Sequence, residues 1–388
     1  KRLQMHYFSS NLIVGILGGG QLGKMLLYET QKFDIKTKVL DSNAQAPARW
    51  SCNEFVHGDL MDFDTVVAFG QNTDVLTIEI ENVNVDALEH LEQKGIKVYP
   101  SSATLRTIQH KGRQKSFYKD NKIPTAEFTH YKNRAEAIQA IQSGQHAFPC
   151  VWKSCQFGYD GYGVKMLRNI DDLKDLLDVE CIIEKCIPFE KELAVVVARN
   201  PKEEVKAYPV VEMEFHPEAN QVEYVLCPAR IDNEIAKKAT EIALKVSKAY
   251  QHVGLLAVEL FLTTSGEILV NEVAPRPHNS GHYSIEASYT SQFEQHLRSI
   301  LNLPLGMTDS KVAGIMVNLV GEEGHSGDVF YENIEEIMKM EGVTPHIYGK
   351  KQTRPFRKMG HVTVVNSSMI RARELAEWVK KTIKVKSK

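Results

Sequence analysis

The segment 255–282, LLAVELFLTTSGEILVNEVAPRPHNSGH, is the part of the chain that decides its fold. It begins with two apolar runs joined by the turn sequence TSGE, and this pattern predicts two paired strands in a β-hairpin. Each predicted strand carries one glutamate, Glu259 or Glu272, among apolar neighbours. A carboxylate in such surroundings is costly unless it meets a cation. The hairpin therefore predicts a site with a positively charged partner.

Asn271 precedes Glu272 and adds an amide oxygen to the two carboxylates. Hard oxygen ligands of this kind suit a Mg²⁺ ion that bridges the phosphates of a nucleotide. The alternative is that an arginine satisfies both glutamates, since Arg276 is close in sequence. The loop PRPHNSGH follows at once and combines hydrogen-bond donors, two prolines and a glycine, so it can place donors at the γ-phosphate end of the nucleotide.

Further upstream, Lys153 ends the apolar run PCVWK and is followed by the glycine-rich sequence GYDGYG at 158–163. A fixed cation beside a glycine flap suits a triphosphate; the alternative is an ordinary hairpin with a surface lysine. The sequence EKCI at 184–187 then ends another predicted strand, with Glu192 after the turn. This segment can offer backbone groups to adenine and a carboxylate to the ribose, although solvated glutamates at a strand end are the simpler interpretation.

The amino-terminal part contains a competing signal. Strands alternate with helices over residues 12–100, which predicts a doubly wound parallel sheet. Gly18 to Gly23 satisfies G-x-G-x-x-G between a strand and a helix, and Asp41 ends the second strand. This is a dinucleotide-binding fingerprint, so an NAD-dependent oxidoreductase is a competing hypothesis.

Two basic segments flank the central region. Residues 101–124 predict one polar, basic helix that ends at Pro124 and connects to a second domain. Residues 350–361, KKQTRPFRKMGH, form a basic cluster, which is either a solvated turn or a ribose-phosphate site.

Composition limits the classes of function. A chain of 388 residues is expected to form several domains, and its net charge of −2 provides no general attraction for nucleic acid or anionic membranes. Six cysteines without a C-x-x-C pair indicate free thiols in a reducing compartment. The apolar runs are of strand length, and no signal-type apolar region follows the basic start. We therefore expect a cytoplasmic protein.

The lysine with its glycine flap, the E-x-x-I segment with a following glutamate, and the Glu…Asn-Glu pair together resemble the ATP-grasp superfamily. Within it, GGGQLGKM, GYDGYG, NEVAPRPHNSGHYSIEA and YGK…RKMGH resemble the N5-carboxyaminoimidazole ribonucleotide synthases, from about Asn11 to Asn366. The resemblance implies an α/β and α+β ATP-grasp fold. Its parts would be a parallel-sheet preATP-grasp domain, an ATP-grasp domain with a flap subdomain at about 124–190, and a small mixed C-terminal domain, at 11–110, 111–307 and 308–388.

The resemblance also implies an activity. The expected ligase carboxylates 5-aminoimidazole ribonucleotide (AIR) with ATP and bicarbonate, and it gives N5-carboxyaminoimidazole ribonucleotide (N5-CAIR), ADP and phosphate in purine biosynthesis. It would need Mg²⁺ or Mn²⁺ but neither NAD nor flavin. It would form a homodimer without nucleic-acid or membrane partners.

The site residues that the resemblance implies fall into four groups. Those expected to hold ATP are Lys111, Lys153, Gly158, Tyr159, Asp160, Gly161, Tyr162, Gly163, Val164, Glu184, Lys185, Cys186, Ile187, Glu192, Asn271 and Glu272. The expected metal ligands are Glu259 and Glu272. Those expected to face AIR are Gly20, Gln21, Asn279, Ser280, Lys350, Arg354, Arg357 and Lys358. The expected catalytic residues are Asp160, Arg276, His278 and Lys350.

The chain departs from the family pattern in the flap, where Tyr162 and Val164 stand at positions that commonly hold a cation and a glutamine. Lys24 replaces a common arginine. Other ATP-grasp enzymes are alternatives, namely a formate-dependent glycinamide ribonucleotide transformylase or a biotin carboxylase. A nucleotide-binding regulator without turnover is a further alternative.

Overall fold

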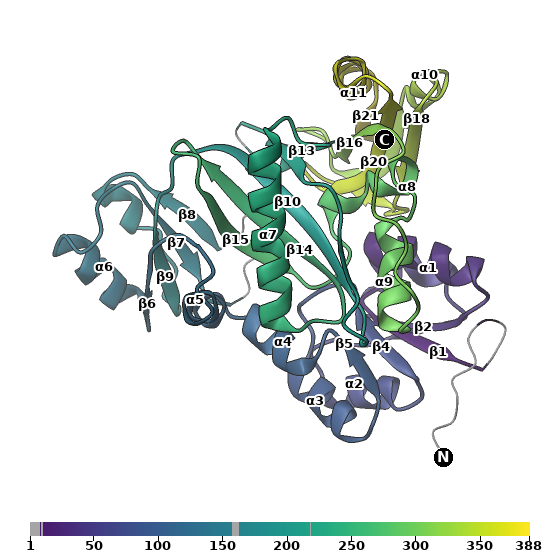
Figure 1. Ribbon diagram of the computed structural model, residues 1–388, viewed down its shortest axis with the longest axis horizontal. Coiled ribbons are helices and arrows are strands. Elements are labelled where there is room, and N and C mark those ends of the chain that lie inside the picture. The colour runs from purple at the N-terminus through teal and green to yellow at the C-terminus, as the bar shows by residue number, and fades with distance from the viewer. Residues whose placement is uncertain (1–7, 9–10, 157–162, 218) are drawn as a thin grey trace.

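The computed structural model describes residues 8, 11–156, 163–217 and 219–388, and within these residues the strands form four sheets. Figure 1 shows the amino-terminal sheet below a large central sheet, with a smaller sheet beside it. None of the helices in the described ranges is both long and apolar enough to cross a membrane.

The amino-terminal sheet confirms the predicted doubly wound arrangement. Its five strands are all parallel in the order β3-β2-β1-β4-β5. The order reverses between β1 and β4, and in such sheets ligands bind beyond the carboxyl ends of the strands at this point. The elements are β1 (Ile13–Leu17), α1 (Gln21–Lys32), β2 (Lys36–Asp41), η1 (Pro47–Trp50), β3 (Glu54–His57), α2 (Phe63–Gly70), β4 (Val75–Ile78), α3 (Val85–Gln93) and β5 (Lys97–Tyr99).

The prediction of one helix over residues 101–124 is wrong. Two helices occupy this segment, α4 (Ser102–Ile108) and α5 (Lys111–Asp120). The break falls at His110, whose backbone is extended and whose ring nitrogen Nδ1 accepts a hydrogen bond from the Arg113 amide. His110 therefore caps α5 and makes Lys111 its first residue. Histidine is not among the usual capping residues, so the pattern did not reveal this boundary.

The four-stranded sheet has the order β6-β9-β7-β8 and is covered by α6. Strands β7 and β8 pair with Lys153 opposite Val164, so they form the predicted hairpin around the glycine flap. Residues Gly158 to Tyr162 of that flap lie outside the described residues. The elements are β6 (Phe128–Tyr131), α6 (Arg134–Gln142), β7 (Cys150–Ser154), β8 (Val164–Leu167), η2 (Ile170–Leu173) and β9 (Cys181–Lys185).

The central sheet is covered on one face by the long helix α7, which crosses β10 and β14 in Figure 1. Leu193, Val195, Val258 and Leu260 pack against this helix. Because side chains alternate along a strand, Glu192 and Glu259 lie on the opposite face. The elements of this region are β10 (Phe189–Arg199), β11 (Val205–Ala207), β12 (Val211–Phe215), β13 (Val222–Cys227), α7 (Asn233–Tyr250), β14 (Gly254–Thr263) and β15 (Ile268–Ala274).

The same sheet continues into the carboxyl-terminal region, because β13 pairs with β16 and the order runs β15-β14-β10-β12-β13-β16-β20-β18. The limits proposed for the three domains stay predictions, but the third region shares its sheet with the second. The elements after β15 are η3 (Asn279–Gly281), α8 (Ser284–Ala287), α9 (Gln292–Ile300), β16 (Ala313–Val320), β17 (Gly327–Glu332), α10 (Ile334–Met338), β18 (Val343–Ile347), β19 (Gln352–Thr353), β20 (Lys358–Asn366), α11 (Met369–Thr382) and β21 (Lys384–Ser387).

Candidate functional site

The predicted hairpin is confirmed, and it places Glu259 of β14 directly opposite Glu272 of β15. The next pair in register is Leu260 with Val270, so Asn271 is an additional residue on β15 and forms a β-bulge. In a regular strand Asn271 and Glu272 would face opposite sides of the sheet. The bulge instead allows both side chains to contact cations of the same site.

Two lysines contact the bulged strand. Lys111 Nζ lies 3.0 Å from Glu272 Oε2, and Lys153 Nζ donates to Asn271 Oδ1 over 3.2 Å. Lys111 acts most strongly on Glu272 and lowers its pKa to about 2, and Glu272 in turn raises the pKa of Lys111. Both groups are therefore charged at neutral pH, and the contact is an ion pair.

The alternative in which Arg276 satisfies the strand glutamates is wrong. Arg276 Nε lies 2.8 Å from Glu81 Oε1, whereas His278 Nε2 lies 3.1 Å from Glu259 Oε1. Glu81 follows β4 at the carboxyl edge of the amino-terminal sheet. Arg276 thus joins the loop after β15 to the point where that sheet changes its strand order. Sequence reasoning did not identify Glu81, because only the fold brings it near residue 276.

Glu192 lies on the same face of β10 and completes an acidic group with Glu259 and Glu272. Burial raises the pKa of Glu192 to about 8, and the negative charges of the other two glutamates contribute. A divalent cation would relieve this repulsion. The donor set, carboxylates with an amide oxygen, fits Mg²⁺.

A second buried network surrounds Glu184 at the end of β9. Lys153 Nζ lies 2.8 Å from Glu184 Oε2, and Lys115 Nζ lies 2.8 Å from Glu184 Oε1. Burial alone would raise the pKa of Glu184, but the two lysines outweigh it and hold the pKa below its ordinary value. Burial lowers the pKa of Lys115 to about 8. Sequence reasoning missed Lys115, although it lies one helical turn after Lys111 and so shares its face of α5.

The segment that follows Glu184 connects the two sheets. Lys185 is exposed, Cys186 and Ile187 are half-buried, and β10 begins two residues later. The lysines come from α5 and β7, while the acidic group comes from β10, β14 and β15. The site therefore lies between the four-stranded sheet and the central sheet. Gly163 precedes β8, and Val164 is the first residue of that strand.

The glycine loop after β1 binds carboxylates of its own chain. Gly19 N donates to Asp41 Oδ2 over 2.6 Å, and Gly23 N donates to Glu79 Oε2 over 3.1 Å. A Cβ atom on Gly20 would lie 2.8 Å from Glu79 Oε1, so this glycine is needed for the close approach. The amides and the acid that a dinucleotide would use are engaged with each other, which argues against the redox hypothesis. Gly20 precedes α1, and Gln21 is its first residue.

The loop after β15 also contacts the carboxyl-terminal strands. Asn279 and Asn318 of β16 exchange two amide hydrogen bonds of 2.9 and 3.0 Å. His282 stacks on His361 of β20 with 4.8 Å between ring centroids. Burial holds the pKa of His282 well below its ordinary value, and electrostatic interactions with His278, His346, Lys358 and Arg276 lower it further.

The remaining predicted residues have the following contacts. His278 Nδ1 lies 2.9 Å from the hydroxyl oxygen of Ser280. Lys350 Nζ donates to the Lys358 carbonyl over 2.7 Å, and Arg357 donates to the Gln352 carbonyl over 2.6 Å. Arg354 is exposed. Asp160 lies outside the described residues. The fold thus brings the loop of residues 276–280 towards Lys358, while the roles of these residues stay predictions.

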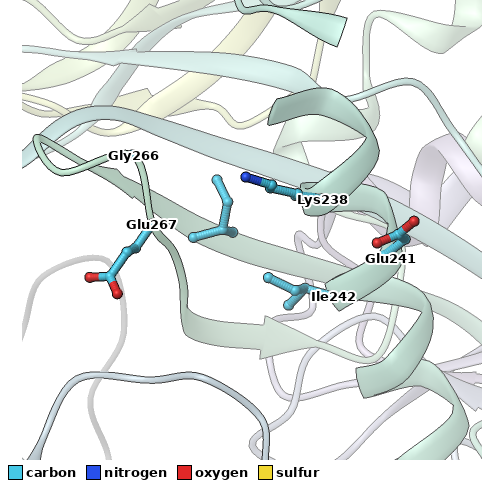
Figure 2. Close-up of a pocket in the computed structure, with 6 residues that line it drawn as sticks. Lys238, Glu241, Ile242, Gly266 and Glu267 are labelled. Atoms are coloured by element: carbon cyan, nitrogen blue, oxygen red, sulfur yellow. The ribbon is translucent and has the colours of Figure 1, made fainter. Parts of the chain in front are cut away.

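A depression of about 300 Å³ lies on the opposite face of the hairpin, between α7 and the turn after β14 (Figure 2). Lys238, Glu241 and Ile242 of the helix and Gly266 to Ile268 of the turn line it. It is separated from the acidic group by the thickness of the sheet, so it is not part of the candidate site.

Three family models match successive parts of the chain. The ribonucleotide synthetase preATP-grasp domain matches residues 12–109, and the ATP-grasp domain matches residues 116–293. The phosphoribosylaminoimidazole carboxylase C-terminal domain matches residues 314–375.

Similar proteins come from bacteria, fungi and plants. N5-carboxyaminoimidazole ribonucleotide synthase of Bacillus subtilis is 36% identical over 90% of this chain and 90% of its own length. The phosphoribosylaminoimidazole carboxylases of Ogataea methanolica and Vigna aconitifolia are 37% and 38% identical over 92% of this chain. The chain spans only about two thirds of these two relatives, 67% and 65% of their lengths.

Solved structures agree with this relationship. N5-carboxyaminoimidazole ribonucleotide synthetase of Thermotoga maritima is 44% identical and superimposes with a TM-score of 0.90 over 97% of this chain and all of that chain. The synthase of Aspergillus clavatus, solved with ADP and 5-aminoimidazole ribonucleotide, is 33% identical with a TM-score of 0.87 over 95% and 98% of the two chains. The chain therefore belongs to the N5-carboxyaminoimidazole ribonucleotide synthase family of ATP-grasp proteins.

Proposed function

We propose that this protein is an ATP-dependent ligase that carboxylates AIR with bicarbonate and releases N5-CAIR, ADP and phosphate in purine biosynthesis. The observation that carries the proposal is the pairing of Glu259 with Glu272 across β14 and β15, beside Lys111 and Lys153, in a site between two sheets. Family membership supports it, and so does the solved relative that holds ADP and the aminoimidazole ribonucleotide.

In the nucleotide part of the site, Glu259 and Glu272 would hold Mg²⁺ or Mn²⁺, with Asn271 beside them. When bound, the metal supplies positive charge that offsets the phosphate oxygens. Lys111 contacts Oε2 of Glu272, so the metal can bind through Oε1, or Lys111 can leave Oε2 and turn its ammonium to the phosphates. Lys153 makes the same exchange from Asn271 and Glu184. Binding thus exchanges partners of equal charge: the lysines turn from carboxylates to phosphates, and the glutamates turn from ammonium groups to the metal.

The remaining predicted ATP residues belong to the same proposal. The segment from Glu184 to Ile187 would contact adenine and Glu192 the ribose, because both lie where the two sheets meet. Gly158 to Val164 would close over the phosphates and exclude water.

The reaction is expected to proceed in two transfers. A bicarbonate oxygen attacks the γ-phosphorus atom, the bond to the β–γ bridging oxygen breaks, and ADP leaves with that electron pair. The exocyclic amine of AIR then forms a bond to the carboxyl carbon of carboxyphosphate, phosphate leaves, and the amine loses a proton. His278 is proposed to take this proton on Nδ1: Glu259 holds the ring through Nε2, and Nδ1 would exchange its contact with Ser280 for the amine. Arg276 can stabilise the carboxyl oxygens; Asp160 and Lys350 are the other proposed catalytic residues.

The ribonucleotide would bind where the loop after β15 meets the glycine loop and the basic cluster. Arg276 reaches this place through its contact with Glu81. The residues proposed to contact AIR are Gly20, Gln21, Asn279, Ser280, Lys350, Arg354, Arg357 and Lys358. All six cysteines are free thiols, which supports a reducing, cytoplasmic setting. The homodimer is proposed from the family resemblance alone, and sedimentation equilibrium tests it.

The test of the function is phosphate release from ATP with AIR and bicarbonate together and with each withheld. We expect full turnover only when both are present. Undiminished turnover without AIR would reject this acceptor, and turnover with formate and glycinamide ribonucleotide would favour the transformylase. Binding of ATP without any turnover would favour the regulator, and NAD reduction would favour the oxidoreductase.

A further inference from the structure

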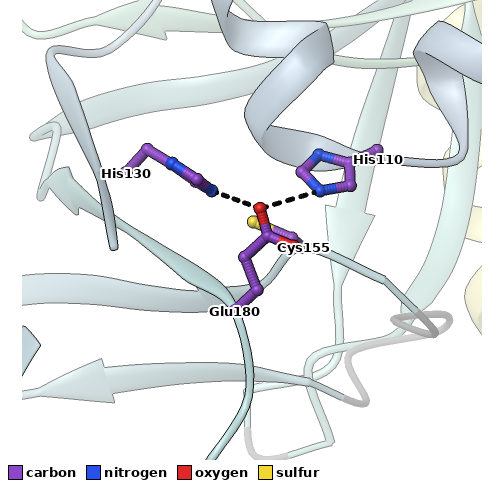
Figure 3. A group of neighbouring side chains, drawn as sticks. All are labelled: His110, His130, Cys155 and Glu180. Carbon is purple, nitrogen blue, oxygen red and sulfur yellow. Dashed lines mark hydrogen bonds and ion pairs between the residues drawn. The ribbon is translucent and has the colours of Figure 1, made fainter. Parts of the chain in front are cut away.

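Four side chains that offer three kinds of metal-binding atom, nitrogen, sulfur and oxygen, meet beside the nucleotide site (Figure 3). His110 caps α5, His130 lies on β6, Cys155 follows β7, and Glu180 precedes β9. Their ligand atoms all lie within 4.8 Å of one another. These residues belong to neither the family motifs nor the proposed ATP and AIR contacts, so the cluster needs its own explanation.

Both imidazole rings point at one carboxylate oxygen. His130 Nε2 lies 2.6 Å and His110 Nε2 lies 3.2 Å from Glu180 Oε1, as Figure 3 shows. Burial would raise the pKa of Glu180, but the hydrogen bonds from the two histidines outweigh it and lower the pKa. The carboxylate is thus ionised, and two nitrogens and an oxygen already converge beside the sulfur of Cys155.

The backbone around Cys155 resembles the outer shell of a metal–thiolate site. The backbone amide of Gly112, in the first turn of α5, and the Lys111 ammonium both act on the sulfur and oppose the effect of burial on the pKa of its thiol. Amide donors and a helix amino terminus both favour a thiolate. Burial is the larger effect and raises the pKa of the Cys155 thiol to about 12, so an ion must displace a proton when it binds.

Gly112 also sets the spacing of the two rings. A Cβ atom at this position would lie 2.9 Å from His130 Cδ2 and 3.1 Å from His110 Cε1. A larger residue here would therefore displace one or both rings from their present positions. Glycine at this position therefore favours the present convergence of the two histidines.

We propose that His110, His130, Cys155 and Glu180 form a binding site for a divalent transition-metal ion of the Zn²⁺ type. Imidazole nitrogen, thiolate sulfur and carboxylate oxygen are the ligands of zinc, whereas Mg²⁺ prefers oxygen alone. Tetrahedral coordination at ordinary zinc distances separates ligand atoms by roughly 3.3–3.8 Å. The two nitrogen–oxygen contacts, at 2.6 and 3.2 Å, are shorter than this, so these side chains must move slightly apart when the ion binds.

The ion can reach the site from solvent. The side chains of His130 and Glu180 are 40% and 41% exposed, whereas His110 and Cys155 are buried behind them. Binding has two identifiable costs. His110 Nδ1 accepts from the Arg113 amide, so its proton is on Nε2 and must move to Nδ1 when Nε2 binds the ion. The cap of α5 and the contacts of both histidines with Glu180 are then lost, and four metal–ligand bonds replace them.

The proposal does not depend on the enzymatic activity. An occupied site would connect the start of α5 with β6, the end of β7 and the start of β9. Lys111 N already donates to the Cys155 carbonyl over 2.9 Å, so the cluster is attached to the first residue of α5. We therefore expect the metal to stabilise this part of the chain against unfolding.

The test uses the full chain, stripped with a chelator and titrated with Co²⁺ alone as a spectroscopic substitute for Zn²⁺. We expect one equivalent to bind with a cobalt–thiolate charge-transfer band, to be displaced by Zn²⁺ but not by Mg²⁺, and to raise Tm. Cys155→Ser should abolish the band, and Glu180→Gln should weaken binding at least tenfold. Cys52→Ser, at a half-buried cysteine in the turn before β3, is the matched control and should keep the band.

Two results would overturn the proposal: no charge-transfer band in the wild-type protein, or a band that persists in Cys155→Ser. Gly112→Ala keeps all four ligands but displaces one or both rings, so it should weaken Co²⁺ binding while the thiol remains. Near-ultraviolet circular dichroism of each variant shows that it is folded before titration. If folded Gly112→Ala binds as tightly as wild type, the assigned geometry is wrong.

Discussion

Lys111 Nζ lies 3.0 Å from Glu272 Oε2, and this ion pair joins residues that are 161 positions apart in sequence. The Lys111 ammonium offsets the negative charge of Glu272, which lies beside Glu192 and Glu259 on the same face of the sheet. A bound metal would take over this compensation. The pair therefore connects the charge balance of the unliganded protein with the proposed binding of ATP, and its two members can be tested separately.

Glu272→Gln should abolish turnover. The amide keeps the size of the side chain but removes the charge that would hold the metal, and loss of metal-assisted charge stabilisation is expected to lower kcat about 10³-fold or more. Phosphate release in the presence of AIR and bicarbonate measures the effect. Glu267→Gln, at the exposed turn of the same hairpin, is the matched control and should keep wild-type activity. Activity retained in Glu272→Gln would remove the metal assignment.

Lys115→Met should destabilise the protein and weaken ATP binding. It leaves Glu184 buried with one cation instead of two, and breaking a buried ion pair costs about 3 kcal/mol of unfolding free energy. Denaturant unfolding and the KM for ATP measure the two effects. Lys119→Met, one turn further along the same helix and exposed, should change stability by less than about 0.5 kcal/mol. Equal stabilities for the two variants would show that the Lys115–Glu184 pair contributes nothing.

The hairpin and the parallel sheet could be predicted from sequence because each has a local cause. Apolar alternation and a turn motif define β14 and β15, and Glu259 and Glu272 stand out as charges within apolar runs. The β-bulge at Asn271 could not be predicted, since it depends on how β15 pairs with β14. The interruption of the helix at His110 was missed because its cap is an imidazole.

The partners of the predicted residues were also beyond the sequence. Lys115 has no motif of its own, and its importance follows from burial next to Glu184. Glu81 acquires a role only because the fold brings Arg276 to the edge of the amino-terminal sheet. The glycine loop matched a dinucleotide-binding motif, but in the structure the Gly23 amide of this loop donates to the Glu79 carboxylate. Contacts between residues so far apart in sequence produce no local motif or periodic pattern from which they could be predicted.

Arg276→Lys should weaken AIR binding and leave ATP binding unchanged. Lysine keeps the charge but loses the planar fork that contacts Glu81 and could also bind a carboxyl group or phosphate. We expect kcat/KM for AIR to fall about 10²-fold, with the Kd for ADP measured by calorimetry within a factor of two. The control is Arg298→Lys on α9, which pairs with Glu294 away from the site. A parallel loss of ADP affinity would place Arg276 at the nucleotide instead.

Glu192 should make the stability of the protein depend on pH. Burial, with the charges of Glu259 and Glu272, raises its pKa from about 4.5 to about 8, so the folded state retains a proton that the unfolded state releases. This contribution to stability is complete below pH 4.5 and is lost as pH rises to about 8.

Glu192→Gln removes this pH dependence because the amide does not titrate. The Tm of the variant minus the Tm of wild type should therefore increase by about 2 °C or more between pH 5 and 8 and stay constant above pH 8. Glu190→Gln, exposed on the same strand, should follow the wild-type curve. Bound Mg²⁺ with ADP should reduce this pH-dependent change in the Tm difference, because a cation beside the three glutamates favours the ionised form of Glu192. Parallel curves for Glu192→Gln and wild type at every pH would show that Glu192 is already ionised in the unliganded site.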